Sequence, residues 1–396
     1  MPAHRVRVQT LERIRNDVWR FTSLAAAAVV ATGLLPWHET SDVTRRMAPI
    51  LLFLVAITVL AELAEVAMVF DVAAHEAAHL ARGRTPLLFL LVAGLATVTT
   101  ILLGLDTTAV LLTPVVLSLA AQLQLSPLPF AMVTVWLANT ASLLLPVSNL
   151  TNLLALHRLH LSPHEFFTRM WLPTIVSVTL TVVVLGLRYH RDLRGTYEVP
   201  SHPGVTDRLL FALTTLACLG LVPGILLGGD PTLVVTVAAA ALVVVFAVRR
   251  RAALRFGLVP WRLSLFVLGL ALLVAAVLRH GGDRVVASIT GTGDGLGALL
   301  HVAGVGAVSS NLLNNLPAYL VVEPDAAGGG PTRLLALLIG TNVGPLVLLW
   351  GSLATLLWRE RCRARGVEVS ARHFAAMGLL GVPIVLVATT VALSLT

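Results

Sequence analysis

The chain has 396 residues, of which 57% are hydrophobic and 12% charged, with a mean hydropathy of +0.89. No ordinary soluble domain has this composition. Apolar windows of about twenty residues recur along the whole length, which predicts an all-α polytopic membrane protein surrounded by a lipid bilayer. The 28 permanently basic residues are all arginine and flank the apolar runs. Membrane topology therefore explains the isoelectric point near 11.0, and we expect no nucleic-acid partner.

Nine segments have the length and apolar character of full membrane crossings. They are 21–36, 47–70, 130–157, 171–188, 208–227, 232–248, 262–278, 333–358 and 373–395. Two further apolar segments, 86–123 and 294–322, carry a polar break at their centres, Asp106–Thr108 and Asn311 through Asn315. Each is either a pair of crossing helices or a hairpin that dips into the membrane and returns. Both choices give the same orientation for the rest of the chain.

Arginine placement predicts the topology. If the N-terminal segment 1–20 is cytoplasmic, the inside segments hold 21 arginines and the outside segments hold 7. An excess of arginine on the cytoplasmic side is the general rule. We therefore predict a multi-pass protein of the plasma (inner) membrane with its N-terminus in the cytoplasm and its C-terminus outside. The first apolar run is interpreted as a retained helix and not as a signal peptide, because no small-residue cleavage site is evident.

The two halves of the chain repeat each other. Asn139 corresponds to Asn342 and Asn149 to Ser352, at a constant offset of 203 residues. By the arginine count, the first polar break is entered from inside and the second from outside. The halves are therefore expected to be inverted relative to each other, and inverted repeats with discontinuous helices are typical of secondary transporters.

Polar breaks within apolar sequence are the candidate substrate-binding elements. Helix ends at such breaks leave unpaired N–H and C=O groups, whose dipoles point toward whatever binds between them. Asn, Ser and Thr side chains donate and accept hydrogen bonds without a fixed charge, which suits a small hydroxylated or oxyanionic solute. The alternative is that these groups only hold helices together. Four polar clusters with inverted symmetry favour a transport site instead, and they are Asp106–Thr108, Asn139–Asn152, Asn314–Pro317 and Asn342–Thr355. The candidate residues are Asp106, Thr107, Thr108, Asn139, Ser142, Ser148, Asn149, Thr151, Asn152, Asn314, Asn315, Asn342, Ser352 and Thr355.

Asp106 is the candidate for proton coupling. It lies between two apolar runs at midplane depth, where a charged side chain is costly and usually functional. Its alternative role is to cap the helix that begins at Thr107, and the two roles are compatible.

A zinc-protease motif points to a different class of protein. His75-Glu76-Ala77-Ala78-His79 matches H-E-x-x-H, in which two histidines on one helical face bind zinc beside a glutamate base. The motif lies in a short Ala/Arg stretch that suits an amphipathic linker at the inner surface. The only nearby candidate for the third ligand is Asp106, which has no recognisable companion motif. An intramembrane metalloprotease is the distant alternative, and we expect no metal site, no cofactor and no catalytic residue. The distant pair Cys218 and Cys362 adds no disulfide framework and no metal spacing.

Three runs of the sequence resemble signature segments of a known family, the arsenite-efflux permeases (arsenical pump membrane proteins) of the ion transporter superfamily. The runs are ASLLLPVSNLTNLL at 141–154, SSNLLNNLPA at 309–318 and GTNVGPLVLLWGSLATLLW at 340–358. The resemblance extends from about residue 47 to the C-terminus. The chain departs from it at the first polar break, where the permeases commonly have Asn-Asp-Gly and this chain has Leu105-Asp106-Thr107.

The resemblance implies an inverted-repeat fold with two re-entrant hairpins and two broken helices, preceded by the segment 1–20. The implied ranges are 21–200, with hairpin 86–123 and broken helix 130–157, and 201–396, with hairpin 294–322 and broken helix 333–358.

The resemblance also implies a function: secondary transport that exports arsenite and antimonite, by proton antiport or with a partner ATPase subunit. A homodimer is implied in the same way. The closest alternative is a sodium- or proton-coupled transporter of a carboxylate or inorganic anion on the same fold.

Overall fold

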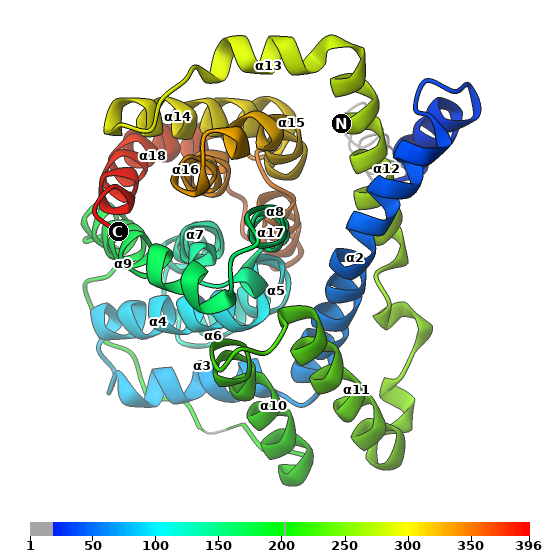
Figure 1. Cartoon of the computed structure of the whole chain (residues 1–396). Coiled ribbons are helices and arrows are strands. Elements are labelled where there is room, and N and C mark those ends of the chain that lie inside the picture. Colours follow the sequence, from blue (N-terminus) through cyan, green and yellow to red (C-terminus); the bar gives the residue numbers. More distant parts are fainter. Residues whose placement is uncertain (1–18, 202) are drawn as a thin grey trace, which may run out of the picture.

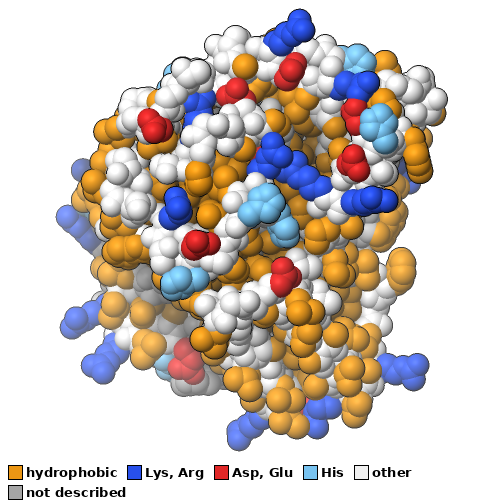
Figure 2. Space-filling view, in the orientation of Figure 1, with side chains coloured by type: hydrophobic (Ala, Val, Ile, Leu, Met, Phe, Trp, Pro, Cys, Tyr) orange, Lys and Arg blue, Asp and Glu red, His pale blue; other side chains and the backbone are white. Residues whose placement is uncertain are grey.

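The computed structural model describes residues 19–201 and 203–396, and within these ranges it is built of helices (Figure 1). Nine helices of the described ranges are long and apolar enough to cross a membrane. Apolar side chains cover much of the face seen in Figure 2, as contact with lipid tails requires. The predicted all-α polytopic fold is confirmed. All but the last two residues of the expected N-terminal segment 1–20 lie outside the described residues.

A helix at Trp19–Ala31 is followed by the long helix α2 (Trp37–Val66). α2 begins ten residues before the predicted span 47–70. Charged residues in its first turns lower the hydropathy without ending the helix, and one of them, Glu39, accepts a hydrogen bond from Arg279. The sequence pattern therefore located the apolar part of this helix and missed its charged start.

The two ends of α2 define two sides of the molecule. The Glu39 side carries the first turns of α2 and Arg279. The Arg250 side carries the last turn, where Arg250 donates a 3.1 Å hydrogen bond to the carbonyl of Val66. The amphipathic linker that the sequence predicts is helix α3 (Val69–Leu80), which follows α2 on the Arg250 side.

The first hairpin consists of α4 (Thr85–Leu103) and α6 (Thr113–Gln122). Gly104, the short helix α5 (Leu105–Thr107) and a π turn at Thr108–Leu112 join the two arms. Both arms pack against α3. The hairpin therefore enters and leaves on the Arg250 side.

A broken helix follows the first hairpin. Its halves α7 (Pro127–Thr140) and α8 (Leu150–Leu159) are separated by two 3₁₀ turns, Ala141–Leu143 and Pro146–Ser148. Pro146 lacks the N–H that a continuous helix needs here. The complete crossing α9 (Pro163–Arg188) ends the repeat, and Ser162 and Glu165 form a capping box at its start.

The second repeat has the same parts in the same order. Its hairpin arms α14 (Leu296–Leu313) and α15 (Asn315–Gly328) meet at Asn314 and pack against the surface helix α13 (Asp283–Thr290). The segment that contains Arg279 leads directly into α13, which places this hairpin on the Glu39 side. The broken helix and final crossing are α16 (Pro331–Val343), α17 (Leu353–Ala364) and α18 (Ala371–Leu393).

Three further helices complete the fold: α10 (Arg208–Leu226), α11 (Pro231–Arg249) and α12 (Trp261–Val277). α11 and α12 pack against α2, and together they form one flank of the molecule in Figure 1. The two broken helices lie at the centre of that view, with α4 and α6 on one side and α14 and α15 on the other.

The two repeats match in backbone detail. The 3₁₀ turn Ala141–Leu143 corresponds to Gly344–Leu346 at the offset of 203 that the sequence shows. The hairpin tips also match, with φ 88° and ψ 166° at Gly104 and φ 86° and ψ 154° at Asn314. Because one hairpin enters from each side, the repeats are inverted.

Some predicted boundaries change. α9 begins at Pro163 and not at 171, and α17 continues to Ala364 beyond the predicted 358. In both places the helix runs on through charged residues outside the apolar run, which hydropathy does not register. The hairpin 294–322 is likewise longer, because α15 extends to Gly328.

Candidate substrate-binding site

Each hairpin tip contacts the broken helix of its own repeat. In the first repeat, Ser148 Oγ donates a 3.0 Å hydrogen bond to the carbonyl of Ile101, one turn before Gly104. In the second, Asn314 Nδ2 donates a 3.0 Å hydrogen bond to the carbonyl of Trp350. A Cβ on Gly104 would lie 3.4 Å from the Ser148 carbonyl oxygen, so the close approach and the positive φ both favour glycine there.

The second halves of the broken helices begin with side-chain caps. Asn149 is extended, at φ −156° and ψ 145°, and its Oδ1 accepts a hydrogen bond from the Thr151 N–H. Ser352 has nearly the same conformation, and its Oγ accepts from the Thr355 N–H at 3.1 Å. Two capped helix N-termini therefore face the centre of the protein, where their dipoles favour electron-rich oxygen atoms.

A cluster of buried amides joins the two repeats. Asn149 Nδ2 donates to Asn342 Oδ1 at 2.5 Å, and Asn342 Nδ2 lies 3.4 Å from Asn152 Oδ1. Asn152 in turn donates to the carbonyls of Ser142 and Leu145. Each of the three amide nitrogens in this cluster donates to an oxygen atom, so α8 and α16 are held together across the repeat boundary.

Asn139, the counterpart of Asn342 in the first repeat, makes different hydrogen bonds. Its Nδ2 donates to the Val135 carbonyl of its own helix at 2.9 Å, and its buried Oδ1 has no hydrogen-bond partner. Ser352 and Thr355, which are the counterparts of Asn149 and Asn152 in the second repeat, bond to each other at 2.7 Å. The two repeats therefore have the same backbone conformation here but differ in which side chains form hydrogen bonds with each other.

A cavity of about 40 Å³ lies where the two tips and the two N-termini converge. Its polar lining residues are Asp106, Asn149, Asn314 and Asn315. Such a space holds one very small solute or water. A second space of about 40 Å³ lies beside Asp106 and adds Thr107, Ser148 and Thr58 to the surroundings of the carboxylate.

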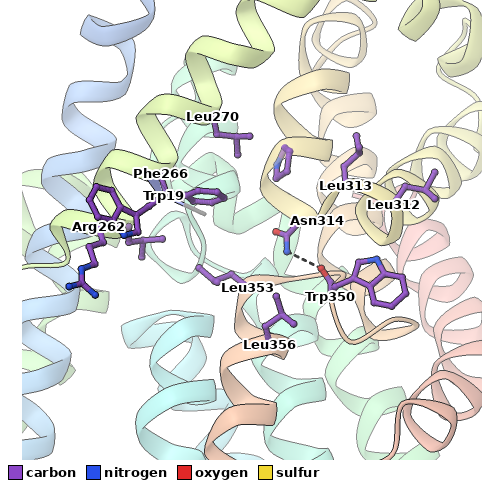
Figure 3. A pocket seen from close by; sticks show the side chains of 12 residues that line it. Trp19, Arg262, Phe266, Leu270, Leu312, Leu313, Asn314, Trp350, Leu353 and Leu356 are labelled. Atoms are coloured by element: carbon purple, nitrogen blue, oxygen red, sulfur yellow. Dashed lines mark hydrogen bonds between the residues drawn. The ribbon is translucent and has the colours of Figure 1, made fainter. Parts of the chain in front are cut away.

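A larger chamber of about 510 Å³ adjoins the small cavity, and the two share Leu263, Phe266, Asn314 and Leu353. Figure 3 shows Asn314 and Leu353 between Phe266 on one side and Trp350 on the other. Trp19 and Arg262 lie at the far end of the chamber, near the start of α12. The chamber therefore leads from the polar cavity toward the Arg250 side.

The candidate residues fall into two sets. The first set lines the two small cavities: Asp106, Thr107, Ser148, Asn149, Asn314 and Asn315. Asn342 and Asn152 lie one and two hydrogen bonds behind this lining. Asn342 and Asn152 belong to the second set, which lines neither cavity and also contains Thr108, Asn139, Ser142, Thr151, Ser352 and Thr355. Thr108, for example, bonds to Thr100 at 2.8 Å inside the first hairpin.

Two other residues of this region were not among the candidates, although Asn311 was placed in the second polar break. Asn311 bonds to the Gly344 carbonyl at 2.7 Å and accepts from the Leu348 N–H, so it ties α14 to the second break. Its position in the run SSNLLNN was a usable signal. Phe266 of α12 gave no signal, because an apolar residue within an apolar span is indistinguishable from its neighbours.

The H-E-x-x-H motif lies on α3, away from the cavity. His75 Nδ1 is 2.8 Å from the Asp71 carbonyl oxygen. Across residues 19–201 and 203–396, no three His, Cys, Asp or Glu side chains are grouped so that they would hold a metal ion.

An all-helical membrane protein with inverted repeats and broken helices around a polar cavity is a secondary transporter. The family model CitMHS, described as a citrate transporter, matches residues 18–350, and the chain belongs to this family.

Similar proteins agree with this class. The chain is 27% identical to an arsenical pump membrane protein of Yersinia enterocolitica, over 94% of this chain and 92% of that protein. It is 28% identical to an arsenical pump membrane protein of Escherichia coli K12, over 86% of this chain and 85% of that protein. The solved YdaH transporter of Alcanivorax borkumensis shares the fold, with a TM-score of 0.58 at 15% identity over 91% of this chain and 89% of that one. These relatives are transporters and not enzymes, as the sequence predicts.

Proposed function

We propose that this transporter exports trivalent arsenic and antimony hydroxides in exchange for protons. The observation that carries the proposal is the cavity where Asp106 meets Asn149, Asn314 and Asn315. The names of the two bacterial relatives support the choice of arsenic. Arsenite is a neutral trihydroxide at physiological pH, and its O–H groups both donate and accept hydrogen bonds. Amides and helix N-termini bind such a solute without the desolvation cost of a fixed charge.

Asp106 is the proposed coupling residue. Its carboxylate accepts either a proton or an O–H group of the substrate at the same small cavity. Mutually exclusive occupation of one carboxylate links the two fluxes in opposite directions, which is what antiport requires. The location supports this role, because Asp106 borders both small cavities.

We further propose that the Arg250 side faces the cytoplasm. Among the described residues, the segments on that side hold most of the arginines, 17 against 7. The chamber beneath Asn314 would then admit substrate from the cytoplasm, the direction that export needs.

The test is arsenite accumulation in a bacterial host without its own arsenic pumps. Expression of the chain should lower cell-associated arsenite, and collapse of the proton gradient should abolish the effect. Asp106→Asn should remove proton-driven transport in everted vesicles while the protein still elutes as a single species in detergent. Asp207→Asn is the matched control, because Asp207 is a carboxylate at the surface that caps α10 and pairs with Arg249. Unchanged arsenic accumulation at good expression would remove arsenite as the substrate.

A carboxylate substrate is the second candidate, favoured by the family description and by the two helix N-termini at the cavity. Among the described residues that line the small cavity there is no arginine, and Arg262 lies only in the chamber. A multiply charged carboxylate would lack a cationic partner at the cavity. Uptake of labelled citrate by the same vesicles separates the two candidates.

A further inference from the structure

A buried ion pair lies outside the candidate site. Glu323 of α15 is 1% exposed and accepts a hydrogen bond from Arg46 of α2. Tyr319, one turn earlier on α15, donates to the same carboxylate oxygen at 3.4 Å. Arg158 at the end of α8 is the other charged group that acts on this carboxylate. One buried negative charge is thus placed among two arginines and a tyrosine from three helices.

The ion pair lies on the opposite side of the small cavity from the chamber. Glu323 is eight residues beyond Asn315, which is about 12 Å along α15 from the hairpin tip. That direction leads to the Glu39 side, because both arms of this hairpin leave there against α13. In this structure the cavity has an adjoining chamber toward the Arg250 side and an ion pair toward the Glu39 side.

Arg46 and Glu323 belong to different parts of the transporter. α2 packs against α10, α11 and α12, whereas α15 packs most extensively against α14 and α16 of the second repeat and less extensively against α12. The pair therefore connects the flanking helices to a substrate-binding hairpin. Any movement that opens the Glu39 side by separating α15 from α2 has to break it.

Breaking this pair is costly while Glu323 is ionised. Separation would leave a buried carboxylate without its main partner, which is strongly destabilising. A proton on Glu323 removes that charge, and Arg46, whose side chain is 39% exposed, can be solvated by water. Protonation is therefore the low-energy way to release α15 from α2.

We propose that Glu323 is a second proton-binding site of this transporter. Ionised Glu323 holds α15 against α2 and keeps the Glu39 side closed, and protonated Glu323 releases it. The proposal rests on proton-coupled transport through this fold, but it does not depend on which solute is carried.

The test measures access to the cavity from the Glu39 side without any substrate. Leu316, which lines the small cavity, is replaced by cysteine in a chain that carries Cys218→Ser and Cys362→Ser. A membrane-impermeant maleimide is added to intact cells, where the proposed orientation exposes the Glu39 side, and to everted vesicles. The labelling rate is compared in mildly acidic and mildly alkaline buffer, and each rate is divided by the rate of the same cysteine in the denatured protein in that buffer, because only the thiolate reacts and acid lowers its fraction.

Acid should speed labelling from the Glu39 side by roughly tenfold, a ratio within the range of common coupling free energies. The Glu323→Gln variant should be labelled rapidly from the Glu39 side in both buffers. The same variant should be labelled more slowly from the Arg250 side than the parent chain. Glu39→Gln is the matched control, because Glu39 pairs with Arg279 within the flanking helices, and it should behave like the parent chain.

The result that overturns the proposal is a Glu323→Gln variant with the parent rate and the parent pH response. If that variant does not fold, Arg46→Gln is measured instead and should label faster than the parent in alkaline buffer. An unchanged rate in Arg46→Gln overturns the proposal equally. Since no arsenic is used, this outcome is independent of the arsenite transport assay.

Discussion

Asn342 is the side chain through which the two repeats meet. It accepts from Asn149 and lies within hydrogen-bond distance of Asn152, and it is 1% exposed. Asn139, its counterpart in the first repeat, bonds only to its own helix and leaves its Oδ1 without a partner. The same residue type at the same repeat position therefore contributes differently to stability.

Replacement of Asn342 by alanine should destabilise the protein more than replacement of Asn139. Asn342→Ala leaves the buried Asn149 amide without its acceptor, which costs about 1–3 kcal/mol. Asn139→Ala removes one hydrogen bond together with an acceptor that was already unpaired, so its cost should be smaller. Thermal unfolding in detergent measures both, and equal losses for the two variants would contradict this assignment.

Some of the residues around the small cavity can be recognised from the sequence alone. Asp106, Asn149 and Asn315 were identifiable because each is polar within apolar sequence, and the structure places all three around one cavity. The sequence did not distinguish Asn139 from Asn342, because their difference lies in hydrogen-bond partners from other helices. Glu323 gave no usable signal for the same reason, since its meaning depends on Arg46 far away in the chain.

At the scale of the element, α14 and α16 approach each other through small residues. A Cβ on Gly340 would lie 2.2 Å from the carbonyl oxygen of Ala303, and one on Gly344 would lie 2.3 Å from the Cα of Ala307. Small residues permit this close packing of membrane helices. The first arm of the second hairpin and the first half of the second broken helix are therefore expected to move as one body.

Gly340→Val should separate these two helices. The new side chain has no room, and overpacking of this kind costs about 1–3 kcal/mol or more. We expect a lower unfolding temperature in detergent and reduced transport. Gly304→Val on α14 is the control, because a Cβ there meets nothing within 4 Å. If both variants unfold at the parent temperature, the two helices are not held by this contact.

The bounds of the helices could be predicted from the sequence where the helices are purely apolar. They were predicted less well where a helix ends in charged residues. α10, α11, α12 and α18 match the predicted spans within two residues. The surface helix α13 was not predicted, because it is short and amphipathic and follows a kink at Gly281.

At the scale of the whole molecule, the inverted arrangement places the C-terminus on the Glu39 side. Thr396 Oγ1 donates to the carbonyl of Arg169 near the start of α9, whereas the α17–α18 connection lies on the other side, where Tyr189 bonds to His373. Under the proposed orientation, in which the Arg250 side is cytoplasmic, the first location is external and the second is cytoplasmic.

Alkaline phosphatase fused after Thr396 should be active, because the enzyme folds only outside the cytoplasm. The same enzyme fused after Arg365, between α17 and α18, should be inactive in the same cells. A fluorescent protein that matures only in the cytoplasm should give the reverse pattern. An active fusion at Arg365 together with an inactive one at Thr396 would reverse the proposed orientation.

One face of α14 has a further consequence. Its buried side packs on α16, whereas Val308 on the other side is 63% exposed. Within the described part of the chain, no other helix covers this apolar face, so the hairpin displaces lipid when it moves. The acyl chains around it must then rearrange. Bilayer thickness then enters the free energy difference between the two access states, through the cost of hydrophobic mismatch. The membrane itself becomes a determinant of the transport rate.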